Sequence, residues 1–367
     1  MPWRGRARLA ENRYKRIERL FVPLMVGIVV AIIASVLLCV AVGEVSIPVD
    51  ESYRILLYKL FGIGQPESSN AMMSIIWKAR VPRILMALCV GAGLALCGVA
   101  MQSSVQNPLA DPYILGASSG ASLGATFAIM AGLGGVSWAN QLGVSTSAFI
   151  GSMGASLLVL VIAGVGGRMT SVKLVLGGTV LNMVCSTFTT LIVYLFPDAD
   201  GMQTVSYWLM GSLAGVGYKD LTYLPAVIAV AIVFFHSQSR VMNTMVLGDA
   251  TANTLGVNTS AHRVVYMITS SLLIAIMVTK CGIIGYVGLI IPHIARGFVG
   301  TDHRKLVPFA VCLGALFLLW CDLLSRSVLG VFGRSGELPI GLITSAIGAP
   351  LLLYRIIRQG FTSGDGH

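Results

Sequence analysis

The sequence predicts an all-α integral membrane protein with about ten transmembrane helices, and three observations support this fold class. The chain has 367 residues, of which 56% are hydrophobic and only 11% charged, whereas a soluble globular chain carries about 25% charged residues. Its mean hydropathy is +0.84, so charged side chains are too few to cover a water-facing surface of this size. The apolar residues also gather in runs, and a membrane-spanning helix needs about 20 such residues.

The first apolar run, Phe21–Val42, follows an arginine-rich stretch. The run is too long for the apolar part of a secretory signal peptide and lacks a good small-residue cleavage site, so we expect a retained first helix. Residues 1–20 are then a basic cytoplasmic arm, residues 21–357 the transmembrane domain, and residues 358–367 a cytoplasmic tail.

Nine further runs are expected to cross the membrane, and the later ones are shorter. Short spans are typical of helices inside a bundle or beside a polar cavity, as in transporters. The stretch Val205–Val216 is too short to cross, so we expect a re-entrant or surface segment there. The nine spans are Ile84–Val105, Tyr113–Leu133, Thr146–Val165, Leu174–Phe196, Thr222–Phe235, Val264–Thr279, Cys281–Ala295, Leu306–Cys321 and Leu338–Tyr354.

The basic residues indicate that both termini are cytoplasmic. With ten spans the termini share one side, and the segments on that side carry more Lys and Arg than the opposite segments. Such an excess marks the cytoplasmic side of a membrane protein. The net charge of +10 therefore belongs to the ends of the spans, and we expect no nucleic-acid partner.

Small residues at helical spacing predict close contact between helices. Gly116, Gly120 and Gly124 lie four residues apart, and small side chains let helices approach closely in lipid. The seven cysteines lie in or beside apolar runs and form no CxxC pair. We interpret them as packing residues rather than as a disulfide framework or a metal site.

The sequence contains no recognisable catalytic constellation. The five histidines form no HExxH or comparable ligand pair, and no Ser, His and Asp set can be argued. The nucleotide-binding patterns GxxxxGKS and GxxxxGKT are also missing. We therefore expect no catalytic residue, no metal site and no cofactor in this chain; if ATP drives transport, ATP and Mg²⁺ bind to a partner subunit.

Three ionisable residues lie within reach of the membrane. Asp322 and Arg326 are four residues apart at one expected span end, and Glu337 precedes the last span. Asp322 and Arg326 can form a local ion pair that anchors a helix end. They can equally be functional, as ionisable residues in spans commonly are, and the residues alone leave both interpretations open.

Two loops have unusual compositions. The segment 107–112 contains two prolines and a carboxylate, which predicts a rigid turn and a helix start. In the longest inner loop, about residues 240–262, Asp249 can cap a short helix through Asn253, and Gly256 can end it. Such a helix can dock a soluble partner, although the residues alone favour a solvated connector.

The motifs in these segments together resemble those of the FecCD family of ABC-transporter permeases, and the resemblance covers about Ile75 to Ile357. Each motif alone is weak, but their order and spacing are specific. The motifs are Arg80-Val81-Pro82-Arg83, Gln102 with Asn107-Pro108-Leu109-Ala110-Asp111-Pro112, Leu115-Gly116, Leu247-Gly248-Asp249 with Ala252 and Leu255-Gly256, Gly285-Tyr286-Val287-Gly288-Leu289, Pro292-His293 with Arg296, Thr301-Asp302-His303-Arg304, Glu337-Leu338-Pro339-Ile340-Gly341 and Gly348-Ala349-Pro350.

The resemblance implies a type II ABC-importer bundle in the bacterial cytoplasmic membrane. It implies a second permease subunit, most simply a second copy of this chain, with the translocation path at the dimer interface. It also implies two cytoplasmic ATPase subunits and one extracytoplasmic substrate-binding protein as partners.

The resemblance further implies roles for particular residues. The ATPase-coupling loop comprises Leu247, Gly248, Asp249, Ala252, Leu255 and Gly256. The cytoplasmic gate consists of Thr170 and Ser171, within the segment Arg168–Ser171. The docking site for the binding protein consists of Arg80, Arg83 and Arg326. The other family-motif positions are Asn107, Pro108, Asp111, Pro112, Pro292, His293, Arg296, Glu337 and Pro339.

The function predicted in this way is import of an iron chelate, a ferric siderophore first, by alternating access. Import of haem or cobalamin is the alternative. A transporter driven by an ion gradient is more distant, because it would usually show a mid-span carboxylate, and Asp322 is expected at a span end. An intramembrane enzyme is not favoured, because no catalytic pair is visible in the spans. A purely structural anchor is not favoured, because it would need neither ten spans nor ordered polar loops.

Overall fold

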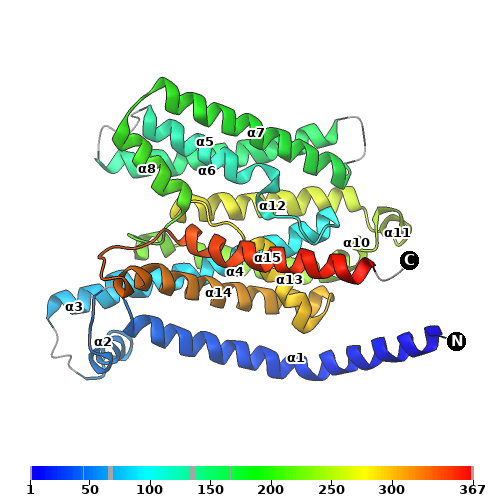
Figure 1. Ribbon diagram of the computed structural model, residues 1–367, viewed down its shortest axis with the longest axis horizontal. Helices are drawn as coiled ribbons and strands as arrows, with labels where there is room; N and C mark the ends of the chain where they lie inside the picture. Colours follow the sequence, from blue (N-terminus) through cyan, green and yellow to red (C-terminus); the bar gives the residue numbers. More distant parts are fainter. Residues whose placement is uncertain are drawn as a thin grey trace.

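The computed structural model describes residues 2–43, 45–64, 69–131, 137–165, 167 and 169–364, and in this part of the chain it contains helices and no strands. Most of the long helices run along one common axis (Figure 1). Both termini lie at the end of the bundle that carries the short helix α11 (Asp249–Thr254), hereafter the α11 end (Figure 1). The opposite end carries α2 (Val49–Phe61) and is called the α2 end.

The described residues include seven helical segments long and apolar enough to cross a membrane, with two shorter apolar helices beside them. Each of the ten predicted runs lies mostly within one helix, so the all-helical membrane bundle is confirmed. These helices are α1 (Pro2–Ala41), α4 (Val81–Val105), α5 (Ala117–Met130), α6 (Ser137–Gly164), α7 (Ser171–Leu195), α9 (Leu224–Ser237), α12 (Thr259–Cys281), α13 (Val287–Val299), α14 (His303–Val331) and α15 (Ile340–Gly364).

Several helix ends differ from the predicted boundaries. The basic residues 2–20 form the first part of α1, continuous with the span, because residues 6–20 contain neither proline nor glycine and are rich in good helix formers. At the other terminus α15 continues to Gly364, so most of the predicted tail is helical. Residues 365–367 lie outside the described part of the chain.

Short helices connect the long ones. The segment predicted at Val205–Val216 consists of the end of α8 and a following loop, and α8 is too short to cross the membrane, as predicted. The region before the second span was not predicted to be helical, yet it contains α2, α3 and a π-helical segment that leads into α4. The short elements are α3 (Asn70–Ser74), π-helix Ile75–Arg80, 3-10 helix Pro112–Leu115, α8 (Ala199–Met210), 3-10 helix Tyr218–Leu221 and α10 (Ser239–Met245).

Helix α4 lies at the centre of the bundle. In its apolar window 83% of the residues are buried, and the helix packs against α12, α13 and α14. Close contact depends on glycine: a Cβ placed on Gly91 would overlap the Gly314 carbonyl of α14, and one on Gly120 of α5 would overlap the Gly151 carbonyl of α6. The predicted small-residue contacts are therefore confirmed at Gly120 and Gly124, where backbones meet without side chains between them. A Cβ on Gly116 would meet only side chains, at 3.4 Å or more, so no such close contact is present there.

Helix α7 lies at the edge of the bundle, packed on α5 and α6 (Figure 1). Only 22% of its apolar window is buried. Large apolar side chains such as Val180, Phe188 and Tyr194 are exposed along it. One long face of α7 is therefore available to lipid or to another protein.

Candidate functional site

The short helix predicted in the longest loop is present at the α11 end. Gly248 and Gly256 have φ angles of 102° and 83°, a region that glycine adopts without steric cost, and they lie on either side of α11. The side chains of Leu247 and Leu255 are 61% and 63% exposed, whereas Ala252 between them is fully buried. α11 therefore rests on the bundle and presents two apolar side chains outward.

Asp249 does not cap α11 through Asn253, so this expectation was wrong. Asp249 is the first residue of α11 and makes no capping hydrogen bond. Its carboxylate instead accepts hydrogen bonds from Arg263 Nη2 at 2.9 Å and from Gln106 Nε2 at 2.7 Å. A charge-assisted bond to a guanidinium is stronger than a neutral one, and Arg263 therefore decides where this carboxylate points.

Arg263, near the start of α12, connects two further segments of the chain. Its Nε donates to the Ser104 carbonyl at the end of α4, at 2.8 Å, and its Nη1 donates to the Met169 carbonyl, also at 2.8 Å. Its Nη2 donates to Ser171 Oγ at 3.3 Å. Arg263 is fully buried. Sequence reasoning counted it only as an inner charge, although an arginine inside a span could have been suspected of a specific role.

The predicted gate residues lie beside this arginine. Thr170 is exposed and caps α7, because its Oγ1 accepts a hydrogen bond from the Lys173 N–H at 3.3 Å. Ser171 begins α7 and contacts Arg263. Arg168, which belongs to the same predicted segment, lies outside the described residues. The gate role of Thr170 and Ser171 stays a prediction.

At the α2 end, two arginines and two carboxylates form one buried charge cluster. Arg83 Nε contacts Asp322 Oδ1 at 2.6 Å, and Arg83 Nη1 contacts both carboxylate oxygens of Glu337, at 2.7 and 2.6 Å. Arg326 Nε lies 3.4 Å from Asp322 Oδ2. Glu337 lies in the loop before α15, and Pro339 is the last residue of that loop. This cluster joins α4, α14 and the entry to α15.

The predicted docking arginines are brought together, but they do not extend freely outward as expected. Arg80, Arg83 and Arg326 are only 5%, 8% and 4% exposed. Arg80 donates to the carbonyls of Val40 at 2.7 Å, Ala41 at 2.9 Å and Val45. All three arginines line a recess of about 350 Å³ that opens at the α2 end. Hydrogen bonds and ion pairs within the chain hold all three guanidinium groups, and their positive charge borders this recess. Their role in docking stays a prediction.

Asp322 does not lie at the end of its span, contrary to expectation. α14 continues beyond it to Val331, and Asp322 is fully buried. It forms the local pair with Arg326, and it also contacts Arg83 of α4, which is remote in sequence. The ion pairs with two arginines give this buried carboxylate a structural explanation, so its burial does not by itself support coupling to an ion gradient.

The segment 107–112 is the rigid turn that its prolines predicted. The Asn107 and Asp111 side chains each accept a hydrogen bond from the backbone N–H two residues further on, at 2.9 and 2.8 Å. Pro108 is exposed at the turn, and Pro112 begins the 3-10 helix. A Cβ on Gly288 of α13 would overlap the Pro112 ring. The turn therefore fixes α13 against the centre of the bundle.

The other motif residues on α13 also join it to α4. Arg296 Nη1 donates to Gln102 Oε1 at 2.6 Å, and Gln102 Nε2 donates to the Leu289 carbonyl at 3.1 Å. Pro292 lies inside α13 and is buried, with the partly buried His293 beside it. Hydrogen bonds and packing between α13 and α4 thus account for these motif residues, and their family roles stay predictions.

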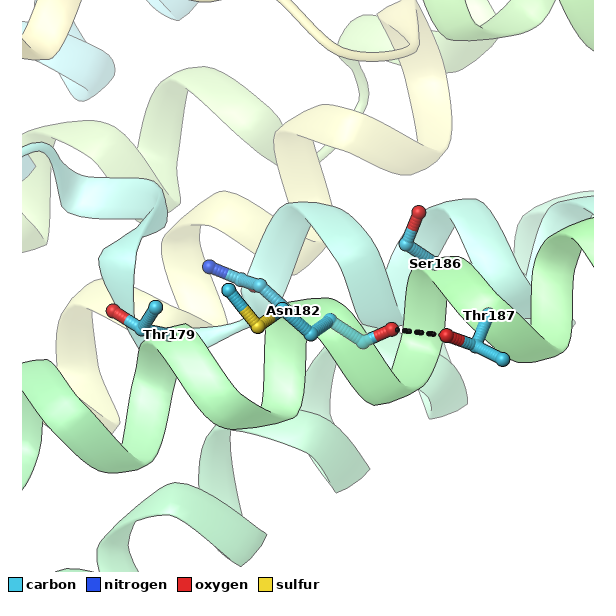
Figure 2. A pocket seen from close by; sticks show the side chains of 5 residues that line it. Thr179, Asn182, Ser186 and Thr187 are labelled. Atoms are coloured by element: carbon cyan, nitrogen blue, oxygen red, sulfur yellow. Dashed lines mark hydrogen bonds between the residues drawn. The ribbon is translucent and has the colours of Figure 1, made fainter.

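A polar face of α7 was not recognised from the sequence. Thr179, Asn182, Ser186 and Thr187 lie along this helix, as Figure 2 shows, and together with Met183 they line a shallow cavity of about 500 Å³. Thr187 Oγ1 donates to the Met183 carbonyl at 2.9 Å, which is the bond drawn in Figure 2. The lining contains hydroxyl, amide and thioether groups and no charged side chain.

A second cavity of about 400 Å³ continues this polar face towards α5. Its lining includes Ser118, Ser119 and Ser122 of α5 together with Asn182 and Thr190 of α7. Ser119 Oγ donates to Asn182 Oδ1 at 2.6 Å and so joins the two helices. Among the described residues no group of three or more His, Cys, Asp or Glu could hold a metal ion. The polar face therefore offers many weak hydrogen-bonding groups and no metal-ligand cluster.

This helical bundle, with a charged recess at one end and an exposed short helix at the other, is the architecture of a multi-pass membrane transport protein. The profile of the FecCD transport family matches residues 27–358, so the chain belongs to this family. The match begins before Ile75, where the motif resemblance began, and therefore includes most of the span in α1. The chain is accordingly an ABC importer permease of the cytoplasmic membrane.

Individual relatives agree with this family. The chain is similar to the ABC transporter permease protein YvrB of Bacillus subtilis (36% identity, 96% of both chains) and to the molybdate import permease MolB of Haemophilus influenzae (32%, 92% of this chain and 97% of MolB). It is 35% identical to the vitamin B12 import permease BtuC of Escherichia coli over 78% of this chain and 84% of BtuC.

A solved structure supports the fold directly. It shows an inward-facing conformation assigned to a metal-chelate type ABC transporter, and it matches this chain with a TM-score of 0.77 and 30% identity. The match covers 92% of this chain and 99% of the solved chain. The named cargoes of these similar proteins differ, so the similarity assigns no single cargo to this chain.

Proposed function

We propose that this permease carries an intact metal chelate, a ferric siderophore first, inward by alternating access along the polar face of α7. The supporting observation is the uncharged hydroxyl and amide lining of the two adjoining cavities. A transition-metal ion without its chelator would need thiolate, imidazole or carboxylate ligands. Hydroxyls and amides instead form many weak hydrogen bonds with a bulky polar ligand, which lets that ligand leave again.

Haem and cobalamin are the alternative cargoes, and molybdate is added because the relative MolB is named for it. The similarity to BtuC supports cobalamin. The polar lining fits the amide groups of a corrinoid or the polar surface of a siderophore better than it fits the apolar ring of haem. We retain the ferric siderophore as the first expectation and make the other cargoes outcomes of the transport test.

The second permease subunit is proposed to be another copy of this chain, packed against α7. Polar groups facing lipid hydrocarbon are costly unless they find partners, and α7 has both polar cavities and little buried surface. A second copy placed there would enclose the polar faces of both chains between them and provide a path shielded from lipid.

The partners are proposed to bind at opposite ends. Two ATPase subunits, which carry ATP and Mg²⁺, dock at the cytoplasmic α11 end, where Leu247 and Leu255 are exposed. An extracytoplasmic binding protein docks at the α2 end, where its carboxylates would approach the recess lined by Arg80, Arg83 and Arg326. Both termini are then cytoplasmic, because they lie at the α11 end (Figure 1).

Transport in proteoliposomes tests the cargo. The chain is purified with its co-purifying ATPase and binding protein, and ATP hydrolysis and uptake are measured with ferric siderophores, haem, cobalamin and molybdate. Stimulation and uptake with a ferric siderophore is the expected result. Uptake of haem, cobalamin or molybdate alone would replace the cargo, and failure of every cargo to stimulate ATP hydrolysis would contradict the proposal.

Cross-linking tests the dimer interface. Met183→Cys places a thiol on the exposed polar face of α7, and Val230→Cys places a matched thiol on exposed α9, where the wild-type side chains are 65% and 70% exposed. Oxidation in native membranes should give a dimer for Met183→Cys and monomer for Val230→Cys and for the parent chain. Equal yields for both variants would contradict an interface at α7.

A further inference from the structure

Arg263 is the one residue through which α11 is joined to the start of α7 among the contacts described here. One side of its guanidinium group faces the Asp249 carboxylate of α11, at 2.9 Å. The other contacts are with the Met169 carbonyl and the Ser171 hydroxyl, at 2.8 and 3.3 Å. Residues 169–171, hereafter the gate segment, therefore contact the same side chain as the proposed coupling helix.

The burial of this side chain makes the connection stiff. Arg263 is 0% exposed, and its Nε is held in addition by the Ser104 carbonyl at 2.8 Å. Gln106 supports the same carboxylate from the end of α4, at 2.7 Å. Removing Asp249 from Arg263 would leave a buried guanidinium with an unpaired charge, which is strongly unfavourable. A displacement of α11 is therefore expected to move Arg263 with it rather than to break the pair.

Both ends of this connection reach the protein surface. The Asp249 side chain is 36% exposed, and it lies on α11 next to the exposed Leu247. At the other end Thr170, between the two residues that Arg263 contacts, is exposed. The planar guanidinium fork suits this arrangement, because it holds several acceptors in fixed directions, which the single ammonium group of lysine cannot do.

We propose that Arg263 is a positioning residue that transmits displacement of the coupling helix α11 to the gate segment. This inference rests on the proposed function for the biological meaning of the displacement. The physical connection itself depends only on the contacts of Arg263, and it can be tested in the permease alone.

A double-mutant cycle in lipid nanodiscs measures the connection. Reporter cysteines are introduced singly at Val172, which is 66% exposed in the first turn of α7, and at Ala250, which is exposed on α11. The rate of modification by a water-soluble maleimide is measured in the wild-type, Asp249→Asn, Arg263→Gln and double-variant backgrounds, with the chain lacking a reporter as background. Lys280→Gln is the matched control, because Lys280 is also a basic residue of α12 that pairs with an aspartate, at 3.0 Å from Asp220.

Asp249→Asn should change the labelling rate at both reporters, by at least about threefold at Val172→Cys. Arg263→Gln should change the rate at Val172→Cys as well, and adding Asp249→Asn to it should have no further effect there. The control should leave both rates unchanged. A change confined to Ala250→Cys, or independent effects of the two substitutions at Val172→Cys, would overturn the proposal.

Arg263→Lys separates positioning from folding, because it keeps the buried charge. In proteoliposomes with the co-purified ATPase, it should assemble like wild type yet carry less cargo per ATP hydrolysed, whereas Lys280→Gln keeps the wild-type ratio. An unchanged ratio for an assembled Arg263→Lys complex would count against the proposal. If wild type transports no cargo, the proposed function fails, while the labelling cycle still decides whether Arg263 connects the two segments.

Discussion

Replacement of Asp322 by asparagine is expected to destabilise the bundle through its buried charge cluster. Asp322 is fully buried, and it contacts Arg83 at 2.6 Å and Arg326 at 3.4 Å. Asparagine is close to aspartate in size, so the change removes the negative charge and leaves the packing nearly intact. Both guanidinium groups are then left in a site where water and lipid headgroups are largely excluded.

The expected loss is about 3 kcal/mol of unfolding free energy. Breaking a buried ion pair by removing one partner typically costs about 3–5 kcal/mol. The lower end applies because Arg83 keeps its second carboxylate, Glu337, at 2.6 Å. Replacing all four members of the cluster by uncharged residues, as Asp322→Leu with Arg83→Met, Arg326→Met and Glu337→Gln, should recover most of this loss, because no charge is then left unpaired.

Unfolding of the purified chain in mixed micelles by titration with a denaturing detergent measures this difference. Asp220→Asn is the control, since its pair with Lys280 is partly exposed, with side chains 31% and 23% exposed, and such pairs contribute at most about 1 kcal/mol. If Asp322→Asn costs no more than Asp220→Asn, the buried cluster does not stabilise the bundle and the reasoning is refuted.

Three further predictions concern other parts of the molecule. Gly98→Ala should cost about 1–3 kcal/mol in the same assay, because its Cβ would overlap the Gly288 carbonyl, whereas Gly154→Ala, with open space around it, should cost nothing. Leu247→Asp should weaken co-purification of the ATPase without lowering stability, because Leu247 is 61% exposed; Val246→Asp, 50% exposed beside it, tests whether the effect is specific. Asp302→Ala should lower stability at pH 7 by about 1 kcal/mol through loss of the α14 cap, and this effect should disappear as the pH falls below about 4. Burial would raise the pKa of Asp302, but the Asn243 amide, the Arg304 N–H and the Arg304 and Lys305 charges together hold that pKa below its usual value. A carboxylate with a lowered pKa stabilises the folded state above its unfolded pKa and loses this effect as it is protonated, so an Asp302→Ala effect that grows towards acid pH would contradict the assignment.

Much of the fold could be predicted because the information is local. All ten predicted runs contain helices, since apolar composition over about 20 residues depends on neighbours in the sequence alone. The short helix before Gly256 could be placed for the same reason, because a glycine with positive φ ends a helix whatever surrounds it. The family could be recognised from the order of the motifs, and the family profile confirms it.

What the sequence determined by itself was therefore the position and order of the apolar helical runs, the scarcity of charge and the lack of a GxxxxGKS or GxxxxGKT pattern. The tertiary structure decided the partners of the charged residues. Arg83 meets Asp322 and Glu337, and Arg263 meets the start of α7, only because particular helices pack side by side. The sequence could not show that Asp249 binds Arg263 rather than capping its own helix, because a local and a distant partner compete for one carboxylate, and the distant guanidinium offers the stronger bond.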